Sequence, residues 1–317
     1  MSEETTISQQ PAMQPGVARS GRARTIEEYG AMMGLALEGE RPNYRPYAPQ
    51  DGDVFITSWA KSGTTLMQQM FHQLRTGARG GDLDFDDISR VVPWEDTAFM
   101  IDFDMTAPQV ATPRGFKSHR EYERLPPAMG YVVTLRDPKE TFVSFYRFLN
   151  GWHLEPGSVA MEDFMPLWMG GGPGGCDYAT HIISWYNRLH EADSLVMTYK
   201  WVVKNRSAAI ARLAQLCGIE LTPAVEELVL ERTTREFMST HEYLFDDGMI
   251  CAVLEERCGV PAASDSTKVQ KQGSTLDALP ASIADQIDAM WAERIAPATG
   301  HASFAELASE VDGACDG

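Results

Sequence analysis

The chain has 317 residues, of which 44% are hydrophobic and 23% are charged, an ordinary balance for a globular protein. Its formal net charge of −18 is less ordinary, because a surface this acidic repels phosphate backbones and anionic lipid. Nucleic acid and membranes are therefore not expected as partners, and an anionic ligand would need a locally basic site.

The N-terminal residues 1–24 are rich in Gln, Pro, Ser and Gly and contain no apolar segment like that of a secretory signal. We expect a disordered arm there. In chain order, the pattern then predicts a helix at 25–39, a strand at 54–57, a helix from 66, strands at 115–117 and 131–135, a helix at 138–149, a helix at about 179–190, a strand at 195–198, and helices around 210–217 and at about 280–294. Residues 151–176 are expected to form a flexible loop, because they contain a glycine-rich run at 170–175.

Strands that alternate with helices predict an α/β fold, in which a central parallel sheet is flanked by helices on both faces. We expect a single domain over residues 25–317. The five cysteines are odd in number and include no CxxC pair. This usage argues against a disulfide framework or a structural zinc site and favours a cytoplasmic protein.

A first candidate anion site is the polar loop between the strand at 54–57 and the following helix. In residues 61–65, Lys61 supplies a charge, Gly63 lets the backbone close on an anion, and Thr64 and Thr65 supply hydroxyl donors. Ser62 is expected to bind the anion as part of the same loop. The lysine precedes the glycine, so this is not the GxxxxGK[ST] loop of nucleoside triphosphatases. The alternative is a turn that only caps the helix.

A second candidate anchor follows the strand at 131–135. Arg136 stands at the end of that strand, where open α/β sheets bind their ligands, and Ser144 lies two turns into the next helix. The alternative is that Arg136 pairs with a nearby acidic side chain.

Taken together, the two segments resemble the sulfotransferase family. Residues 60–66 resemble its 5′-phosphosulfate loop, PKSGTTW, with Ala60 in place of the proline and Leu66 in place of the tryptophan, and residues 136–148 resemble its 3′-phosphate motif, RNPKDVAVSYYHF. The resemblance implies a P-loop-like three-layer fold and the donor 3′-phosphoadenosine 5′-phosphosulfate (PAPS). It spans roughly residues 50–295, and its further matches carry the remaining donor-binding residues, namely Tyr199, Thr234, Arg235, Lys271, Gln272 and Gly273. Arg235 replaces a stacking phenylalanine, and Lys271 with Gln272 replaces Arg-Lys, so we expect weaker donor binding there.

The expected catalytic residues lie just after the strand at 115–117. A histidine titrates near neutral pH and can take the proton of a hydroxyl. Lys117 and His119 resemble the family's KTHLP string, which implies that His119 is the general base of an in-line transfer. Lys117 would then steady the sulfuryl oxygens, and Lys61 would neutralise the leaving phosphate.

The expected acceptor is a small, apolar alcohol or phenol, bound by Trp94, Phe99, Met100, Phe103, the loop 151–176 and residues 240–260. No metal cofactor is expected, because the histidines form no metal-binding pattern. A homodimer remains open. So do three other functions: a nucleotide kinase, a non-catalytic nucleotide-binding regulator, and an enzyme in which sulfation leads to dehydration of the alcohol.

Overall fold

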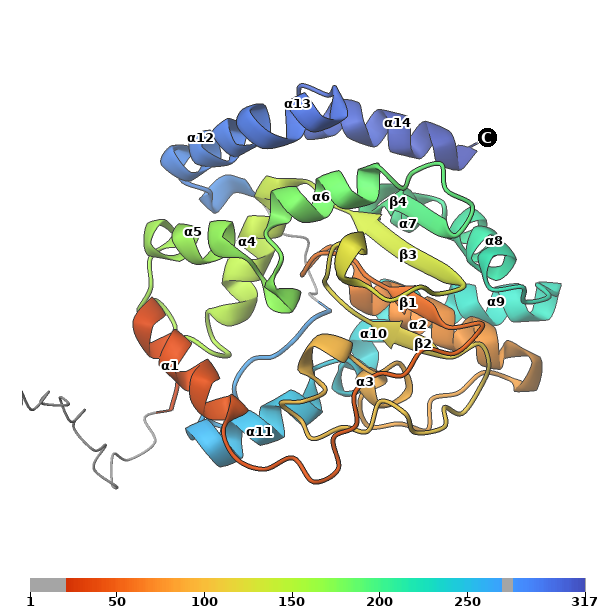
Figure 1. The fold of residues 1–317 in the computed structure, drawn as a ribbon, viewed down its shortest axis with the longest axis horizontal. Coiled ribbons are helices and arrows are strands. Elements are labelled where there is room, and N and C mark those ends of the chain that lie inside the picture. Colours follow the sequence, from red (N-terminus) through yellow and green to blue (C-terminus); the bar gives the residue numbers. More distant parts are fainter. Residues whose placement is uncertain (1–20, 270–275, 317) are drawn as a thin grey trace, which may run out of the picture.

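The centre of the fold is a parallel sheet of four strands, seen in a computed structural model that describes residues 21–269 and 276–316. The strands are β1 (Val54–Ile56), β2 (Gly115–Lys117), β3 (Gly130–Leu135) and β4 (Ser194–Thr198), in the order β2-β1-β3-β4 (Figure 1). All three neighbouring pairs are parallel. Because strand β1 is central, the loop that follows it lies between the ends of β2 and β3, where ligands bind in open sheets.

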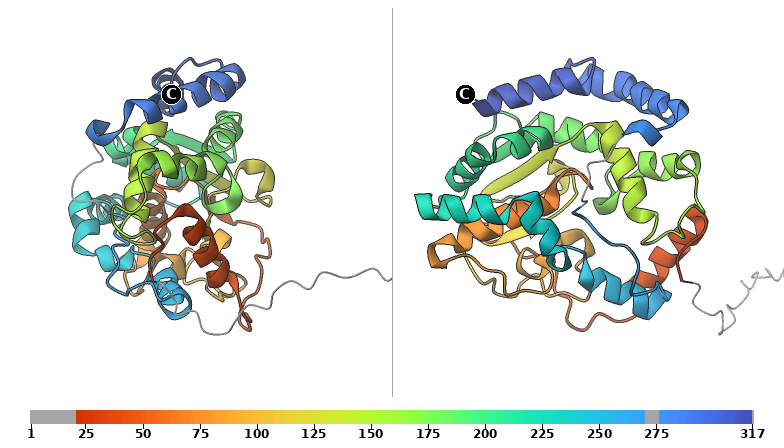
Figure 2. Two further views of the ribbon diagram at one scale, coloured as in Figure 1. Left: turned by 90° about the vertical axis from the view of Figure 1, so that its left-hand side faces the viewer. Right: turned by 180° about the vertical axis from the view of Figure 1, so that it is seen from behind.

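Helices cover both faces of the sheet, as expected (Figures 1 and 2). Alternate residues of each strand point to opposite faces, so Val54 and Ile56 pack with α2, α8 and α9, whereas Phe55 and Val133 pack with α4, α5, α6 and α12. The helices are α1 (Ile26–Leu37), α2 (Thr64–Thr76), α3 (Ile88–Val91), α4 (Pro138–Leu149), α5 (Met161–Gly170), α6 (Tyr178–Tyr186), α7 (Tyr199–Lys204), α8 (Arg206–Leu216), α9 (Pro223–Arg232), α10 (Arg235–Thr240), α11 (Gly248–Cys258), α12 (Ala281–Met290), α13 (Ala296–Thr299) and α14 (Phe304–Asp316). The predicted α/β fold with a covered parallel sheet is confirmed.

The prediction of one irregular loop over residues 151–176 is wrong, because helix α5 lies inside it. Phe164, Met165 and Trp168 recur at helical spacing and are buried in the core. Their burial stabilises a helix that contains Pro166. The glycine-rich run after α5 does lack regular helix or strand, apart from a single 3₁₀ turn.

The N-terminal boundary also differs from the prediction. Ala23, expected in the arm, is buried and donates its N–H to the carbonyl of His153 at 2.9 Å. Its own carbonyl accepts from the N–H of Glu155 at 2.8 Å. These paired backbone groups fix the chain by residue 23, and sequence composition does not reveal such a partner.

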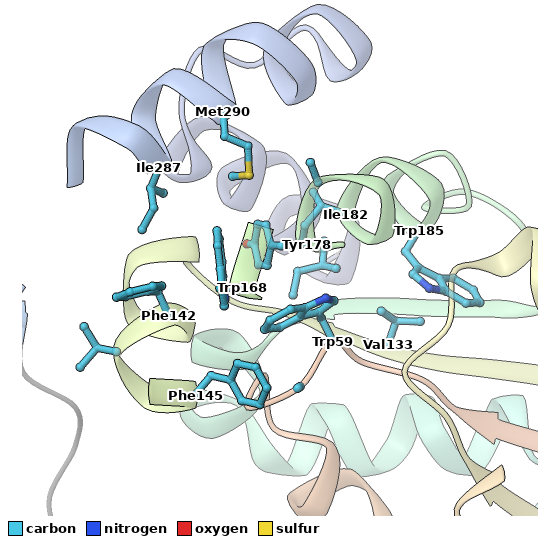
Figure 3. Packing of buried hydrophobic residues seen from close by; sticks show 14 of the residues in the cluster. Trp59, Val133, Phe142, Phe145, Trp168, Tyr178, Ile182, Trp185, Ile287 and Met290 are labelled. Atoms are coloured by element: carbon cyan, nitrogen blue, oxygen red, sulfur yellow. The ribbon is translucent and has the colours of Figure 1, made fainter. Parts of the chain in front are cut away.

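An aromatic cluster holds the end of β1 and the start of the loop that follows (Figure 3). The Trp59 ring makes edge contacts with Phe145, Trp168 and Tyr178 at centroid distances of 5.5 to 5.7 Å. Its Nε1 donates to the carbonyl of Cys176 at 3.1 Å. The loop at 61–65 therefore starts from a rigid point in the core. Within the described part of the chain, none of the helices is long and apolar enough to cross a membrane.

Candidate active site

Two hydrogen-bonded strand ends hold the loop at residues 61–65. The hydroxyls of Ser58 and Thr134 lie 2.7 Å apart, and Thr134 also donates to the carbonyl of Ser62 at 2.7 Å. Lys61 and Gly63 have φ values of 65° and 104°, in the left-handed region. This backbone turns the chain sharply into α2, whose first-turn N–H groups face the loop side with a partial positive charge.

Two hydroxyls of this loop have no hydrogen-bond partner among the described residues. Ser62 Oγ and Thr64 Oγ1 are both buried. Helix α2 also begins without a side-chain cap. Buried polar groups normally find partners, so these donors fit an anion such as a phosphate or sulfate at the helix N-terminus.

Gly63 offers a direct test of this loop. A Cβ at this position would lie 2.5 Å from Cδ2 of Tyr199, and the φ of 104° is strained for any other residue. We expect Gly63→Ala to lower the free energy of unfolding by about 2–4 kcal/mol, through backbone strain and the clash together. Urea denaturation measures this change.

The matched control is Gly80→Ala. Gly80 has a φ of +89°, but no atom lies within 4 Å of the position that an added Cβ would occupy, so only backbone strain applies. Equal losses for the two variants would show that the contact between Gly63 and Tyr199 has no role.

Arg136 and Tyr199 connect the second anchor to the loop. Arg136 donates from Nη1 to the carbonyl of Lys61 at 2.7 Å, and its guanidinium carbon lies 5.3 Å from the centre of the Tyr199 ring. It also pairs with Glu140 at 3.3 Å. The structure thus brings Arg136 beside the loop, while Ser144 is half-buried in the second turn of α4.

Within the described chain, the other residues expected to bind the donor lie on α2 and at the start of α10. Thr234 uses its hydroxyl to cap α10, by accepting from the N–H of Phe237 at 3.1 Å, and Arg235 is exposed. The turn that carries them lies beside α2, because Gln69 donates to the carbonyl of Arg232 at 3.3 Å. Leu66 and Thr65 are half-buried on α2. Lys271, Gln272 and Gly273 lie outside the described residues.

Lys117 and His119 meet at Trp94. The Lys117 ammonium lies 3.3 Å from the centre of the indole ring, and the His119 ring makes an edge contact with the same indole at 5.1 Å. Backbone pairing explains this position, because Lys117 donates to the carbonyl of Pro93 at 2.7 Å. Burial lowers the pKa of Lys117 well below its ordinary value, and the nearby Lys268 adds to this effect.

The tautomer of His119 follows from one contact. Its Nδ1 lies 2.5 Å from the carbonyl oxygen of Ser58. A carbonyl only accepts, so Nδ1 carries the proton and Nε2 of the neutral ring is the basic nitrogen. Burial, together with the charge of Lys117, holds the pKa of His119 well below its ordinary value. The ring is therefore a neutral base at physiological pH.

Asp96, which was not among the predicted site residues, positions this loop. Its carboxylate accepts from the N–H of His119 at 2.7 Å, from Ser118 Oγ at 3.1 Å and from Trp94 Nε1 at 2.9 Å. Arg120 lies 3.1 Å from the same carboxylate. The only sequence signal was its place two residues after Trp94, which was expected to bind the acceptor, and an acidic residue there is ordinarily a solvated one.

Asp247 and Lys268 were also missed. They form a buried ion pair, and the Lys268 ammonium lies 5.9 Å from the Trp94 ring that also binds Lys117. Although burial acts to raise it, the Lys268 and Lys117 ammonium groups hold the pKa of Asp247 below its ordinary value. Burial, reinforced by Lys268, lowers the pKa of the half-buried Lys61 to about 7. An acidic group and three lysines therefore share one electrostatic centre.

The expected acceptor residues divide into two sets. Trp94, Met100 and Trp152 belong to one buried cluster with Ile250 and Leu254 of α11, against which Phe148 packs. Other residues from the segments expected to bind the acceptor lie outside this cluster. Phe164, Met165 and Trp168 are in the core on one face of the sheet, against which Phe103 packs, and Phe245 is in the core on the opposite face. Phe99 and Tyr243 are exposed.

Two surface hollows lie away from this centre. One, of about 580 Å³, is lined by α7, α8 and the end of α14, and the other, of about 530 Å³, by α8 and α9. Neither hollow is lined by Lys61, Lys117, Lys268 or His119, although Thr234, which was expected to bind the donor, lines the second. Among residues 21–269 and 276–316, no group of three or more His, Cys, Asp or Glu side chains is arranged to hold a metal ion.

The chain matches a family model and known relatives. Residues 51–252 match the model of the "Sulfotransferase domain" family. The amine sulfotransferase of Oryctolagus cuniculus is 26% identical over 195 residues, which are 60% of this chain and 64% of that protein. The chain thus spans slightly less than two thirds of that relative's length.

Two solved structures share the fold. Retinol dehydratase in complex with androsterone and the inactive cofactor PAP has a TM-score of 0.61 at 18% identity, over 78% of this chain and 82% of that one. A mouse sulfotransferase complexed with PAP has a TM-score of 0.57 at 16% identity, over 84% and 90% of the two chains. At these identities the likeness shows the fold alone.

Proposed function

Since the chain belongs to the sulfotransferase family, we propose that it transfers a sulfuryl group from PAPS to a hydroxyl of a small acceptor. The observation that carries this proposal is the neutral His119, with its Nδ1 proton held by Ser58 and its ring against Trp94, next to Lys117. This arrangement supplies a base and a cation at the end of β2, beside the anion-binding loop of β1.

The donor is PAPS. The buried hydroxyls of Ser62 and Thr64 and the N-terminus of α2 fit its 5′-phosphosulfate, and Arg136 fits its 3′-phosphate. Bound donor would supply the reactive sulfuryl group. Its negative charge would favour the protonated forms of Lys61 and Lys117, whose pKa values are low in the free protein.

Each of the chain's polar groups then has a role. His119 accepts the proton of the acceptor hydroxyl at Nε2 as the oxygen attacks, and Ser58 stabilises the imidazolium through the Nδ1 proton. Lys117 stabilises charge on the transferred group, and Lys61 stabilises charge on the leaving phosphate. Asp96 keeps the His119 backbone in place.

The donor assignment is tested by thermal unfolding. Adenosine 3′,5′-bisphosphate should raise the melting temperature, because a ligand at about a hundred times its Kd stabilises the folded state by about 2.7 kcal/mol. ATP with magnesium should stabilise much less, since the loop lacks the order of residues that binds a magnesium triphosphate. If ATP stabilised the protein more than the bisphosphate, a kinase-like function would replace ours.

The acceptor reaction is tested with isotopically labelled donor. Mass spectrometry of the products should show the label in a sulfate ester of the acceptor. A dehydrated product with free labelled sulfate would instead indicate that the ester undergoes elimination.

A further inference from the structure

Asp247 is a buried carboxylate with an unused oxygen. It is 1% exposed, and its Oδ1 binds the Lys268 ammonium, whereas its Oδ2 has no hydrogen-bond partner among the described residues. Its backbone is left-handed, with φ 54° and ψ 42°, and it precedes α11 without capping it. Both features cost free energy, and neither is explained by the ion pair with Lys268 alone.

Two neighbouring side chains also have unused polar atoms. Trp152 Nε1 and both ring nitrogens of His153 are buried and have no hydrogen-bond partner in the described part of the chain. Burial lowers the pKa of His153 to about 3, and Asp247 is the charged group that opposes this shift. Asp247 directly precedes α11, whose Ile250 and Leu254 pack in one buried cluster with Trp152.

These polar groups belong to the same aromatic cluster as the transfer site. The Lys61 ammonium lies 3.7 Å from the Phe148 ring centre, Phe148 contacts Trp152 at 4.9 Å, and Trp152 contacts His153 at 4.1 Å. On the other side, Lys268 connects Asp247 to Trp94 and hence to His119. Trp94, Met100 and Trp152 belong to one buried cluster, and both His119 and the Lys268 partner of Asp247 lie beside its Trp94 ring.

The chemistry of these atoms selects the ligand group. Asp247 Oδ2 only accepts hydrogen bonds, and Trp152 Nε1 only donates them. A hydroxyl can do both. An ammonium could satisfy Asp247, but it would add a cation beside Lys61, Lys117 and Lys268, which already compensate the carboxylate.

We propose that the acceptor is an apolar molecule with two hydroxyls, and that Asp247 binds the second while His119 deprotonates the first. This inference rests on the proposed function and specifies its substrate class. Asp247 is a specificity-determining residue, and Lys268 holds its carboxylate in place.

The test uses three acceptors of one length: 1-octanol, 1,8-octanediol and 8-amino-1-octanol, with shorter and longer homologues to find the best spacing. A hydrogen bond to a buried charged group changes binding by about tenfold or more. We expect kcat/KM for the best diol to exceed that of its mono-alcohol by at least about tenfold, well beyond the statistical factor of two. The amino alcohol should gain less than the diol.

The matched variant is Asp247→Gly with Lys268→Met. Removing both partners avoids an unpaired buried charge, and glycine relieves the left-handed backbone, so this variant should fold. In this variant the ratio of kcat/KM for the diol to kcat/KM for the mono-alcohol should fall to about two. The control is Arg188→Met with Asp193→Asn, which removes an ion pair outside this cluster and should keep the wild-type ratio.

The outcomes separate this inference from the function. The role of Asp247 would be overturned by either of two results, while sulfation itself stands. One is that diol and alcohol have equal kcat/KM once the statistical factor of two is removed. The other is that the ratio of their kcat/KM values is unchanged in the Asp247/Lys268 variant. A higher kcat/KM for the amino alcohol would replace the hydroxyl with an ammonium and overturn the charge argument. Absence of labelled product from every alcohol and from an acidic phenol would overturn the proposed function, and this inference with it.

Discussion

Replacing His119 with alanine should lower kcat for an unactivated alcohol by about a hundredfold or more, the usual scale for loss of a general base. The reason is geometric. Ser58 holds the Nδ1 proton, so Nε2 is the basic nitrogen, and His119 touches neither the loop at residues 61–65 nor Arg136 through a hydrogen bond. Binding of adenosine 3′,5′-bisphosphate, measured by calorimetry, should therefore stay close to that of the wild type.

An acidic phenol and the pH dependence provide the controls. A phenol that is already ionised needs no base, so its kcat should fall much less in the variant. Because burial lowers the pKa of His119 below its ordinary value of 6.5, the neutral base persists on the acidic side of that value, and the acid limb of kcat/KM should lie below pH 6.5. His190→Ala, at an exposed histidine, should change neither quantity. Near-normal turnover of an unactivated alcohol by His119→Ala would assign the base to another residue.

Replacing Arg136 with alanine should weaken donor binding by about thirtyfold to several hundredfold, because loss of a charge-assisted contact to a buried phosphate costs on the order of 2–4 kcal/mol. Arg136 also donates to the carbonyl of Lys61, so the variant loosens the loop as well. The KM for PAPS and the Kd for the bisphosphate should rise together.

Two variants show whether this effect is specific. Lys117→Ala should raise the donor KM far less, since Lys117 lies against Trp94 and is proposed to act on the transferred group. Arg147→Ala removes an exposed arginine from the same helix and should leave the donor Kd unchanged. Equal bisphosphate affinities in wild type and Arg136→Ala would remove Arg136 from the donor site.

Much of the fold follows from local sequence. Strand β2 and helix α4 occupy the residues predicted for them. For α4 the reason is that its Asp-Pro start depends only on near neighbours. Helix α5 was missed because glycines and Pro166 are strong local signals against a helix, and only the core that buries Phe164 and Trp168 outweighs them.

The candidate site divides in the same way. Lys61, Gly63, Lys117, His119 and Arg136 were identified from short motifs, since a loop between a strand and a helix places its own residues at the sheet edge. Which of the many aromatic residues surround them was not decided locally. Trp94 and Trp152 are in that cluster, whereas Trp168 is in the core.

The sequence by itself determined the family, the parallel sheet and the residues that carry charge to its strand ends. Only the tertiary structure decided that Asp247 pairs with Lys268 beside Lys117, and that Asp96 holds the backbone of His119. The physical reason is that motifs record constraints between neighbours along the chain. The approach of a carboxylate to a lysine from a distant segment is set by the packing of whole helices and loops, and no local pattern encodes that packing.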